Sequence, residues 1–509
     1  MYDSMLSTVC NFVSCVLILL GFILLIQLFY SMKGNNGKEI PVVSGSLPFF
    51  GHIFEMLEGS PWDVMTRWVI RYGMIYKFHL FGSDCVCVSD PALLKVLLQT
   101  NYLNFKKDLK WTYKPFMAIL GSGLVTADGQ NHRRQRTLLS HPLRIEILEE
   151  IPYMALKAIF RLSLRLSEAA RENAIIEMAE EFRHLTLQVI AEAILSLSPE
   201  ESDQTFAKMY LPIVEEGNKR TWNPTRAYIP SSSWFKHERD ISTLNNYVQS
   251  LIVQRWEERK SGNLKDTSEN RRKDILDRTL DAIPQDQWNE TTMSQIRDEM
   301  KTFILAGHET SASMLTWTLY ELSINEAMKE KVVREAKKLL SRYIENDTFE
   351  PKLMSEFLKS TGTYLQYSEC CLKESLRKYS VVPTVVRVSA DSVKLGDYYL
   401  QKGSKIMINM QGVHHNPLFW PEPHVYKPER FLSKVQPYTF LPFIDGPRMC
   451  LGQYLSLLES KIVLATLLCI YDFEIVNGDA GTKHPYMVPI VPKSGHYMRV
   501  CHRRERGKD

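Results

Sequence analysis

Residues 443–452 of this chain read Phe-Ile-Asp-Gly-Pro-Arg-Met-Cys-Leu-Gly, and apolar residues at helical spacing follow over 455–468. This stretch predicts a glycine-containing loop that ends at the mouth of a helix, with Cys450 at the junction. Backbone N–H groups at a helix start can hydrogen-bond a sulfur anion, and the helix dipole favours the thiolate. Gly446 and Gly452 would let a flat group approach the backbone closely, and Arg448 can pair with a carboxylate. The alternative is a buried structural cysteine, which is the usual state of a lone one.

The cysteine content by itself does not set Cys450 apart. Nine cysteines is an odd number, and their spacing suits neither a disulfide framework nor a zinc site. We expect the Cys370–Cys371 pair to lie in a helix and Cys85 and Cys87 in a strand, in a reducing compartment.

Length and charge restrict the class of protein. With 509 residues the chain can bury a large core, and its helical patterns outnumber its strand-like runs. Lysine and arginine together number 62 against 58 for aspartate and glutamate, so the charge balance gives no indication of nucleic-acid binding. We expect a mainly α-helical body and no nucleic-acid partner.

The N-terminal residues have the character of a membrane anchor. Residues 4–32 contain no charge and 9–30 are nearly all apolar, enough for a helix of about 30 Å. A cleaved signal peptide is the alternative, but no basic segment precedes the run and no clean cleavage site follows it. Lys33 and Lys38 follow the span and Asp3 precedes it, which places the following domain in the cytosol. We expect an anchor over 1–33, a linker over 34–52, a catalytic domain over 53–503 and a tail over 504–509.

Two further motifs stand out. Residues 306–310 read Ala-Gly-His-Glu-Thr inside a helical pattern that covers about 292–324. A glycine in mid-helix costs about 1 kcal/mol relative to alanine, so Gly307 needs a reason. Residues 374–377 read Glu-Ser-Leu-Arg, which puts Glu374 and Arg377 on one helix face as a candidate ion pair.

Together these motifs resemble the cytochrome P450 superfamily. The sequence Phe-x-x-Gly-x-Arg-x-Cys-x-Gly over 443–452 resembles its haem-binding signature, and the other motifs occur in the family's order. The resemblance covers about 41–503 and implies a mainly α fold with a small β region, here preceded by an N-terminal transmembrane helix. It also implies a haem b cofactor (Fe-protoporphyrin IX) whose iron is ligated by Cys450. Glu374 and Arg377 would then form a buried triad with Arg430 of the Pro-Glu-Arg-Phe segment 428–431.

The resemblance also assigns roles around the haem. Glu309 and Thr310 match the catalytic acid–alcohol pair that relays protons to dioxygen, and Ala306 with Gly307 would open space over the iron and let the helix bulge. A back-bond from the Thr310 hydroxyl to its own helix is the alternative. His132 stands where the family usually has tryptophan, and its ring nitrogen could still donate to a propionate. The expected cofactor-binding residues are His132, Arg136, Ala306, Arg387, Phe443, Arg448 and Gly452.

The implied activity is monooxygenation of a lipophilic substrate with O2 and electrons from NADPH–cytochrome P450 reductase. The expected location is the endoplasmic-reticulum membrane, with one span and a cytosolic catalytic domain. Segments such as 306–311 and 414–417 look similar to carotenoid hydroxylases and fatty-acid ω-hydroxylases, so carotenoid, sterol and fatty acid remain open. Expected pocket walls are 116–125, Phe303, Leu305, Ala306, 382–386 and 487–490.

Two other functions remain possible at this point. One is a haem-thiolate isomerase or dehydratase that rearranges a lipid peroxide without a reductase. It would not need the acid–alcohol pair, so Glu309 and Thr310 count against it. The other is a membrane-anchored haem sensor, which would leave the groove at 306–307 unexplained.

Overall fold

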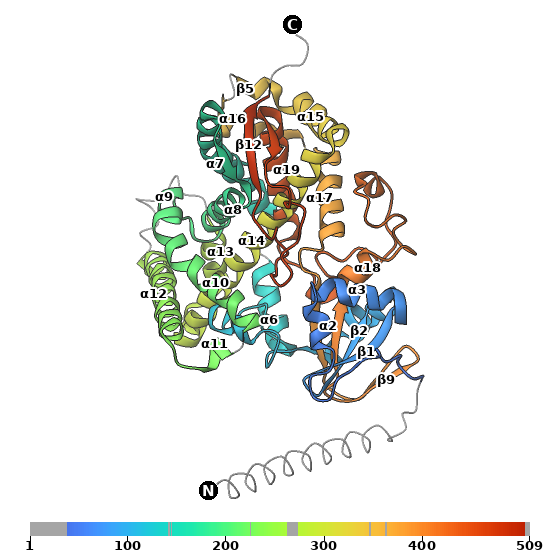
Figure 1. Ribbon diagram of the computed structural model, residues 1–509. Coiled ribbons are helices and arrows are strands. Elements are labelled where there is room, and N and C mark those ends of the chain that lie inside the picture. Colours follow the sequence, from blue (N-terminus) through green and yellow to red (C-terminus); the bar gives the residue numbers. More distant parts are fainter. Residues whose placement is uncertain are drawn as a thin grey trace, which may run out of the picture.

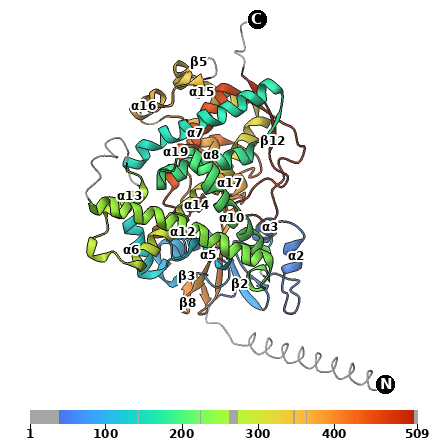
Figure 2. The same ribbon diagram turned by 90° about the vertical axis from the view of Figure 1, so that its left-hand side faces the viewer.

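The computed structural model describes residues 38–140, 143, 145–223, 225–261, 273–345, 348–361 and 364–503. The predicted anchor over 1–33 and the tail over 504–509 lie outside these residues. Most of the described chain is helical, as expected (Figures 1 and 2). The main helices are α5 (Met117–Leu120), α6 (Gly129–Ser140), α7 (Ile145–Glu172), α8 (Met178–Leu195), α9 (Pro199–Glu201), α10 (Ala207–Trp222), α11 (Thr225–Tyr228), α12 (Ser232–Ser261), α13 (Ile275–Asp281), α14 (Glu290–Ile324), α15 (Glu326–Leu340), α16 (Pro351–Thr361), α17 (Gln366–Tyr379), α18 (Met410–His414) and α19 (Gln453–Ile470).

Helix α14 is the central element of the helical body. It packs against α8, α12, α17 and α19, so most of its circumference is buried and its sequence is only weakly amphipathic (Figure 1). It begins where the Asn289 side chain accepts a hydrogen bond from the Thr292 N–H at 3.0 Å, a standard N-cap. The observed helix covers the predicted pattern over 292–324.

A smaller β region lies beside the helices. A five-stranded sheet has the order β1 (Ile75–Leu80), β2 (Ser83–Val88), β10 (Lys405–Asn409), β7 (Thr384–Ser389), β3 (Phe105–Lys107), and only the β2–β10 pair is parallel. Helices α2 (Ile53–Leu57), α3 (Pro61–Tyr72) and α4 (Pro91–Lys95) adjoin it. A second sheet has the order β11 (Tyr471–Ile475), β12 (Tyr497–His502), β4 (Ile175–Glu177), and two-stranded ribbons form from β5 (Ile344–Glu345) with β6 (Thr348–Phe349) and β8 (Val393–Leu395) with β9 (Tyr398–Leu400).

The predicted places of four cysteines are confirmed. Cys85 and Cys87 lie in β2, Cys370 and Cys371 lie in α17, and all four are buried free thiols. They fill core positions, whereas Cys450 lies in a loop.

From residue 38 onward, the segment before α2 is irregular, and it is attached to the sheet. The Val43 N–H donates to the Lys77 carbonyl at 2.9 Å, and the Lys77 N–H donates to Pro41 at 2.8 Å. Among the described residues, α19 is the one helix long and apolar enough to cross a membrane, and it is mostly buried in the core.

Candidate functional site

The loop before α19 places Cys450 as the sequence predicts. A single 3₁₀ turn, η9 (Gly446–Arg448), precedes the cysteine, and α19 begins at Gln453. The Cys450 N–H donates to the Phe443 carbonyl at 2.9 Å, which closes the loop. Gly446 has φ +74°, and a Cβ there would collide with the Leu98 carbonyl, so no other residue fits.

The sulfur of Cys450 is surrounded by groups that act on its charge. Burial raises the pKa of the thiol, while hydrogen bonds from the Gly452 and Gln453 N–H groups and the positive charge of Arg136 lower it. A metal cation on the sulfur would reverse the net direction and hold the thiolate. The two N–H groups and the nearby guanidinium are the kinds of group that stabilise a thiolate ligand.

Space for a flat group is present on both sides of the site. Cys450 is exposed although protein surrounds it, and a Cβ on Gly452 would meet no atom within 4 Å. Ala306 is also exposed, although it lies in the middle of the mostly buried helix α14 between half-buried neighbours. The interior is therefore open next to the predicted ligand and next to the predicted distal groove.

Basic side chains gather beside Cys450. Arg448 donates to the Phe105 carbonyl at 2.7 Å and pairs with Asp128, while its buried Nε has no partner in the described part of the chain. Arg136 donates to the Met449 carbonyl at 2.7 Å, which fixes it against the cysteine loop.

The remaining members of this group lie on strands and on α6. The buried Arg387 donates to the Val386 carbonyl at 2.9 Å, and the β3–β7 register places Lys107 opposite it. Burial and the charges of Arg387 and Arg448 lower the pKa of Lys107 to about 7. Burial and the charges of Lys107, Arg448 and Arg136 lower the pKa of His132 to about 4.

These shifts reflect the repulsion among Lys107, Arg136, Arg387 and Arg448, and they leave His132 uncharged near neutral pH. Asp128 and Glu299 are the carboxylates that enter their electrostatics, too few to neutralise them. Two carboxylates of a bound porphyrin would supply the missing negative charge, so the cluster fits haem propionates. Lys107 was not predicted, because only the pairing of two distant strands brings it next to Arg387.

On α14 the two members of the predicted acid–alcohol pair have separate partners. The Thr310 hydroxyl donates to the Ala306 carbonyl at 2.7 Å, the back-bond that was the alternative for a helical threonine. Glu309 is 8% exposed and accepts a hydrogen bond from Arg183 of α8 at 2.8 Å. Arg183 also binds Glu180 at 2.8 Å. Glu309 therefore faces α8.

The expected role of Gly307 was wrong in one respect. Helix α14 continues through this position without a bulge. A Cβ on Gly307 would lie 2.8 Å from Ile190 of α8, so the glycine is required for close packing of these two helices. The Thr186 hydroxyl donates to the His308 carbonyl at 3.1 Å in the same contact.

The predicted triad is confirmed. Arg377 Nη2 lies 2.8 Å from Glu374 Oε1 and Arg430 Nε lies 3.3 Å from the same oxygen, and both Glu374 and Arg377 are 0% exposed. Arg377 also donates to the His414 carbonyl at 3.0 Å. This network links α17 to the segment that leads into the cysteine loop.

Comparison with known proteins decides the family. The family model described as Cytochrome P450 matches residues 41–497. The chain belongs to the cytochrome P450 family. Cytochrome P450 4c21 of Blattella germanica is 28% identical over 478 residues, covering 89% of this chain and 92% of that protein. LUTEIN DEFICIENT 5 of Arabidopsis thaliana is 28% identical over 85% of this chain and 73% of its own length, and carotene epsilon-monooxygenase of the same plant is 27% identical over 92% and 86%.

Membership confirms the coarse predictions from the sequence. The protein is a cytochrome P450 monooxygenase of mainly helical fold, its cofactor is haem, and it uses O2 and an electron-transfer partner. The relatives include a hydroxylase and a monooxygenase by name, which does not favour the isomerase or sensor interpretations.

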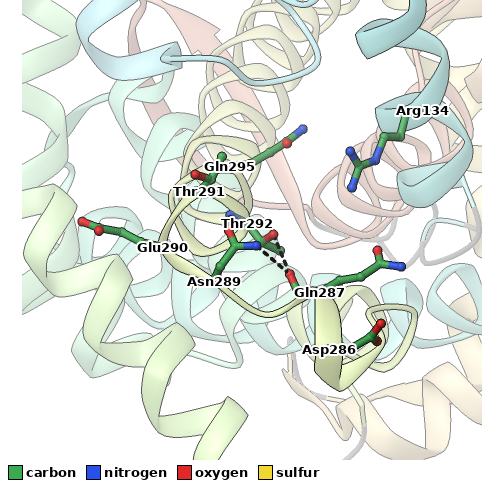
Figure 3. A pocket seen from close by; sticks show the side chains of 8 residues that line it. All are labelled: Arg134, Asp286, Gln287, Asn289, Glu290, Thr291, Thr292 and Gln295. Carbon is green, nitrogen blue, oxygen red and sulfur yellow. Dashed lines mark hydrogen bonds between the residues drawn. The ribbon is translucent and has the colours of Figure 1, made fainter.

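A separate hollow lies at the start of α14. It has a volume of about 730 Å³ and polar walls, and it contains none of the predicted haem contacts (Figure 3). Its lining residues are Arg134, Asp286, Gln287, Asn289, Glu290, Thr291, Thr292 and Gln295. Of the expected pocket walls, Phe116, Phe303, Leu305 and Val382 are partly buried at the edge of the main core, whereas Ile119, Leu120 and Ile490 are buried core residues.

Proposed function

We propose that this cytochrome P450 holds its haem iron through the thiolate of Cys450 and hydroxylates a lipophilic substrate. The observation that carries the proposal is the cluster of His132, Arg136, Arg387, Arg448 and the unpredicted Lys107 beside that cysteine. The three arginines and Lys107 repel one another unless an anion joins them, His132 can donate from its uncharged ring, and haem brings two carboxylates. Phe443 and Gly452 flank the sulfur on the cysteine loop, and Ala306 borders the open groove on α14.

The chain's own side chains divide the work. Haem supplies the activation of dioxygen when it is bound. The Gly452 and Gln453 N–H groups hold negative charge on the sulfur, and the basic cluster fixes the orientation of the porphyrin. Thr310 places a hydroxyl next to Ala306. The carboxylate of the preceding residue, Glu309, is paired with Arg183. The hydroxyl that would donate a proton and the carboxylate that would resupply it therefore lie on one helix.

The substrate belongs to a lipophilic class that includes carotenoids, sterols and fatty acids. Support comes from relatives whose names refer to carotene and lutein and from the partly buried apolar residues Phe303 and Leu305 next to Ala306 on α14. An isomerase acting on a lipid peroxide would have no use for a proton-supplying pair at Glu309 and Thr310.

We propose that the enzyme is attached to the endoplasmic-reticulum membrane by residues 1–33 and receives electrons from NADPH–cytochrome P450 reductase. An exposed aromatic patch near the start of the described chain supports attachment. Its residues are Phe54, Phe50, Phe49, Phe81 and Trp111, and in this order successive rings lie 5.4 to 6.4 Å apart. Such a patch is unusual on a surface that faces only water. Residues 34–52 would then link this anchor to the catalytic domain over 53–503.

The carbon monoxide complex of the reduced enzyme tests the proposal. A thiolate-ligated haem gives a Soret band at its own characteristic position, whereas a histidine-ligated haem absorbs elsewhere. We expect the thiolate band in the native enzyme and its loss in Cys450→Ser, with Cys370→Ser as the matched control that keeps it. A native band at the histidine position, or an unchanged band in Cys450→Ser, would reject the ligand.

A further inference from the structure

The loop between α5 and α6, residues 121–128, lies against helix α14 and is held there by two acidic side chains. The Ser122 N–H donates to Asp298 Oδ2 at 3.1 Å, and the Leu124 N–H donates to Glu299 Oε2 at 2.8 Å. Asp298 and Glu299 are both buried. Two consecutive carboxyl groups of one helix therefore bind alternate N–H groups of the α5–α6 loop.

Glycine at two positions lets this loop lie so close to α14. A Cβ on Gly121 would collide with the carboxylate of Asp298, and a Cβ on Gly123 would collide with the hydroxyl of Thr302. Gly121 also has φ +50°, a conformation that other residues rarely adopt. The glycines therefore make the contact with the acidic pair a specific feature of this loop.

Leu124 connects the loop with the proposed haem site. Its carbonyl accepts a hydrogen bond from Lys107 Nζ at 2.9 Å, while its N–H is bound to Glu299. Asp128, at the end of the same loop, accepts from the Lys107 N–H at 2.8 Å and pairs with Arg448. The α5–α6 loop therefore joins α14 to side chains of the basic cluster that would hold haem.

The charges of Glu299 and Lys107 act on each other. Burial raises the pKa of Glu299 to about 7, although the hydrogen bond from the Leu124 N–H and the charge of Lys107 lower it. Gln295 also lowers this pKa, and Asp298 raises it. Because the pKa of Lys107 is also about 7, an anion beside Lys107 favours its ammonium form, which in turn favours the Glu299 carboxylate. Charged partners make stronger hydrogen bonds, so such an anion strengthens both bonds to Leu124.

The loop borders the expected substrate pocket and the groove on α14. Residues 121–125 belong to the expected pocket wall, and Val125 is half-buried at the edge of the main core. On α14, Glu299 precedes Ala306 by seven residues, which places the two on one face of the helix about 10 Å apart. A shift of the loop would therefore change the shape of the pocket beside the groove.

We propose that Glu299 and Lys107 are positioning residues that fix the α5–α6 loop as a wall of the substrate pocket, and that their hold on Leu124 depends on haem. The inference rests on the proposed haem site and adds a coupling between that site and the pocket. Propionates at the basic cluster would supply the anion, so both hydrogen bonds to Leu124 are strongest in the haem-loaded enzyme. The pocket wall is then complete only after the cofactor has bound.

Hydrogen exchange of the full-length, haem-loaded enzyme, measured by mass spectrometry, tests the positioning role. The readout is the exchange rate of peptides that cover the α5–α6 loop, which contain the Ser122 and Leu124 N–H groups. Because a charged hydrogen bond to Leu124 is lost, we expect Glu299→Gln to speed exchange in these peptides about tenfold and to leave exchange in α17 unchanged. Glu290→Gln is the matched control, since it removes an exposed carboxylate from the first turn of the same helix and should leave the loop unchanged.

Transfer of haem to apomyoglobin tests the coupling. Coupling between two sites is reciprocal, so Glu299→Gln should speed the transfer about fivefold although Glu299 is not among the expected haem contacts. Lys107→Met removes the other hydrogen bond to Leu124 and should also speed exchange in the loop. In the double variant the two effects on loop exchange should be less than multiplicative, because both residues act through Leu124.

Each outcome supports or overturns the proposal. Unchanged loop exchange in Glu299→Gln, or exchange that rises equally throughout the chain, would overturn the positioning role. Unchanged haem transfer in that variant, or fully multiplicative effects in the double variant, would overturn the coupling. If Glu299→Gln does not load haem, Lys107→Met decides, and unchanged loop exchange there would overturn the proposal. The thiolate band of the carbon monoxide complex does not depend on this loop, so the proposed function stands or falls with that band separately.

Discussion

Replacing Glu374 by glutamine removes one negative charge from the most buried ion network of the described chain while keeping the size of the side chain. The carboxylate of Glu374 accepts hydrogen bonds from Arg377 Nε and Nη2, each at 2.8 Å, from the Lys427 N–H at 2.9 Å and from Arg430 Nε at 3.3 Å. Glutamine offers a single acceptor oxygen. Arg377, which is fully buried, would be left with a charge that no carboxylate neutralises.

The expected loss of stability is large because the network is dry. Removing one partner of a buried ion pair costs about 3–5 kcal/mol, compared with about 5–15 kcal/mol for the whole free energy of unfolding of a typical domain. The amide oxygen of glutamine retains part of the hydrogen bonding, so we expect the lower end, about 3 kcal/mol. Haem binding should weaken as a result, because the network supports the segment that leads into the Cys450 loop.

Urea unfolding, followed by the Soret band of the reduced carbon monoxide complex and by far-UV circular dichroism, measures this loss. The matched control is Lys402→Gln, which breaks the Lys402–Asp391 pair, whose side chains are 74% and 73% exposed. An exposed pair contributes about 0–1 kcal/mol, so this variant should unfold close to the native midpoint. If both variants shifted the midpoint equally, the argument from burial would be refuted. The position of the Soret band should stay the same in Glu374→Gln, because the axial ligand is untouched.

Three further predictions concern Thr310, Lys107 and the buried His496 just before β12. Thr310→Ala should lower the product formed per NADPH by roughly tenfold and release peroxide, because proton delivery by a positioned group contributes at least that much to the rate. Thr310→Ser should retain coupling of NADPH use to product. Unchanged coupling in the alanine variant would place the proton relay elsewhere. Lys107→Met should speed the transfer of haem to apomyoglobin about tenfold, because one charged contact to haem is lost. Lys106→Met, at an exposed neighbouring position, is the control. Equal transfer rates in the two variants would exclude Lys107 from haem binding. Burial lowers the pKa of His496 to about 4, against about 6.5 when unfolded, so its contribution to stability is complete above pH 6.5 and about 2 kcal/mol of it is lost by pH 5. Unfolding midpoints at pH 7 and pH 5 should lie closer together in His496→Leu than in the native enzyme, and an identical gap would show that this histidine is not protonated on unfolding.

Local sequence was sufficient where the decisive contacts are local. The loop that ends at Cys450 and the helix that follows it depend on neighbours a few residues away, and both were predicted. The pairing of Glu374 with Arg377 depends on one turn of helix. Arg430 entered only through the family resemblance, since nothing in its own surroundings points to α17.

Predictions failed or were missing where partners are distant in the chain. Gly307 was expected to bulge α14, but the reason for it is Ile190, which belongs to another helix. Glu309 is held by Arg183, 126 residues earlier. Lys107 joins the basic cluster only because β3 pairs with β7. A sequence pattern indicates which side chains a helix or strand exposes on each face, whereas the fold determines which other element those side chains contact.

The hydrogen bonds of Arg448 have a consequence for how the enzyme is made. Its partners Phe105 and Asp128 precede it by 343 and 320 residues, so this side of the proposed haem site joins an early and a late segment of the chain. Contacts between residues so far apart in sequence form slowly, and they form only after the late segment has been synthesised. Cofactor capture therefore belongs to the end of biosynthesis.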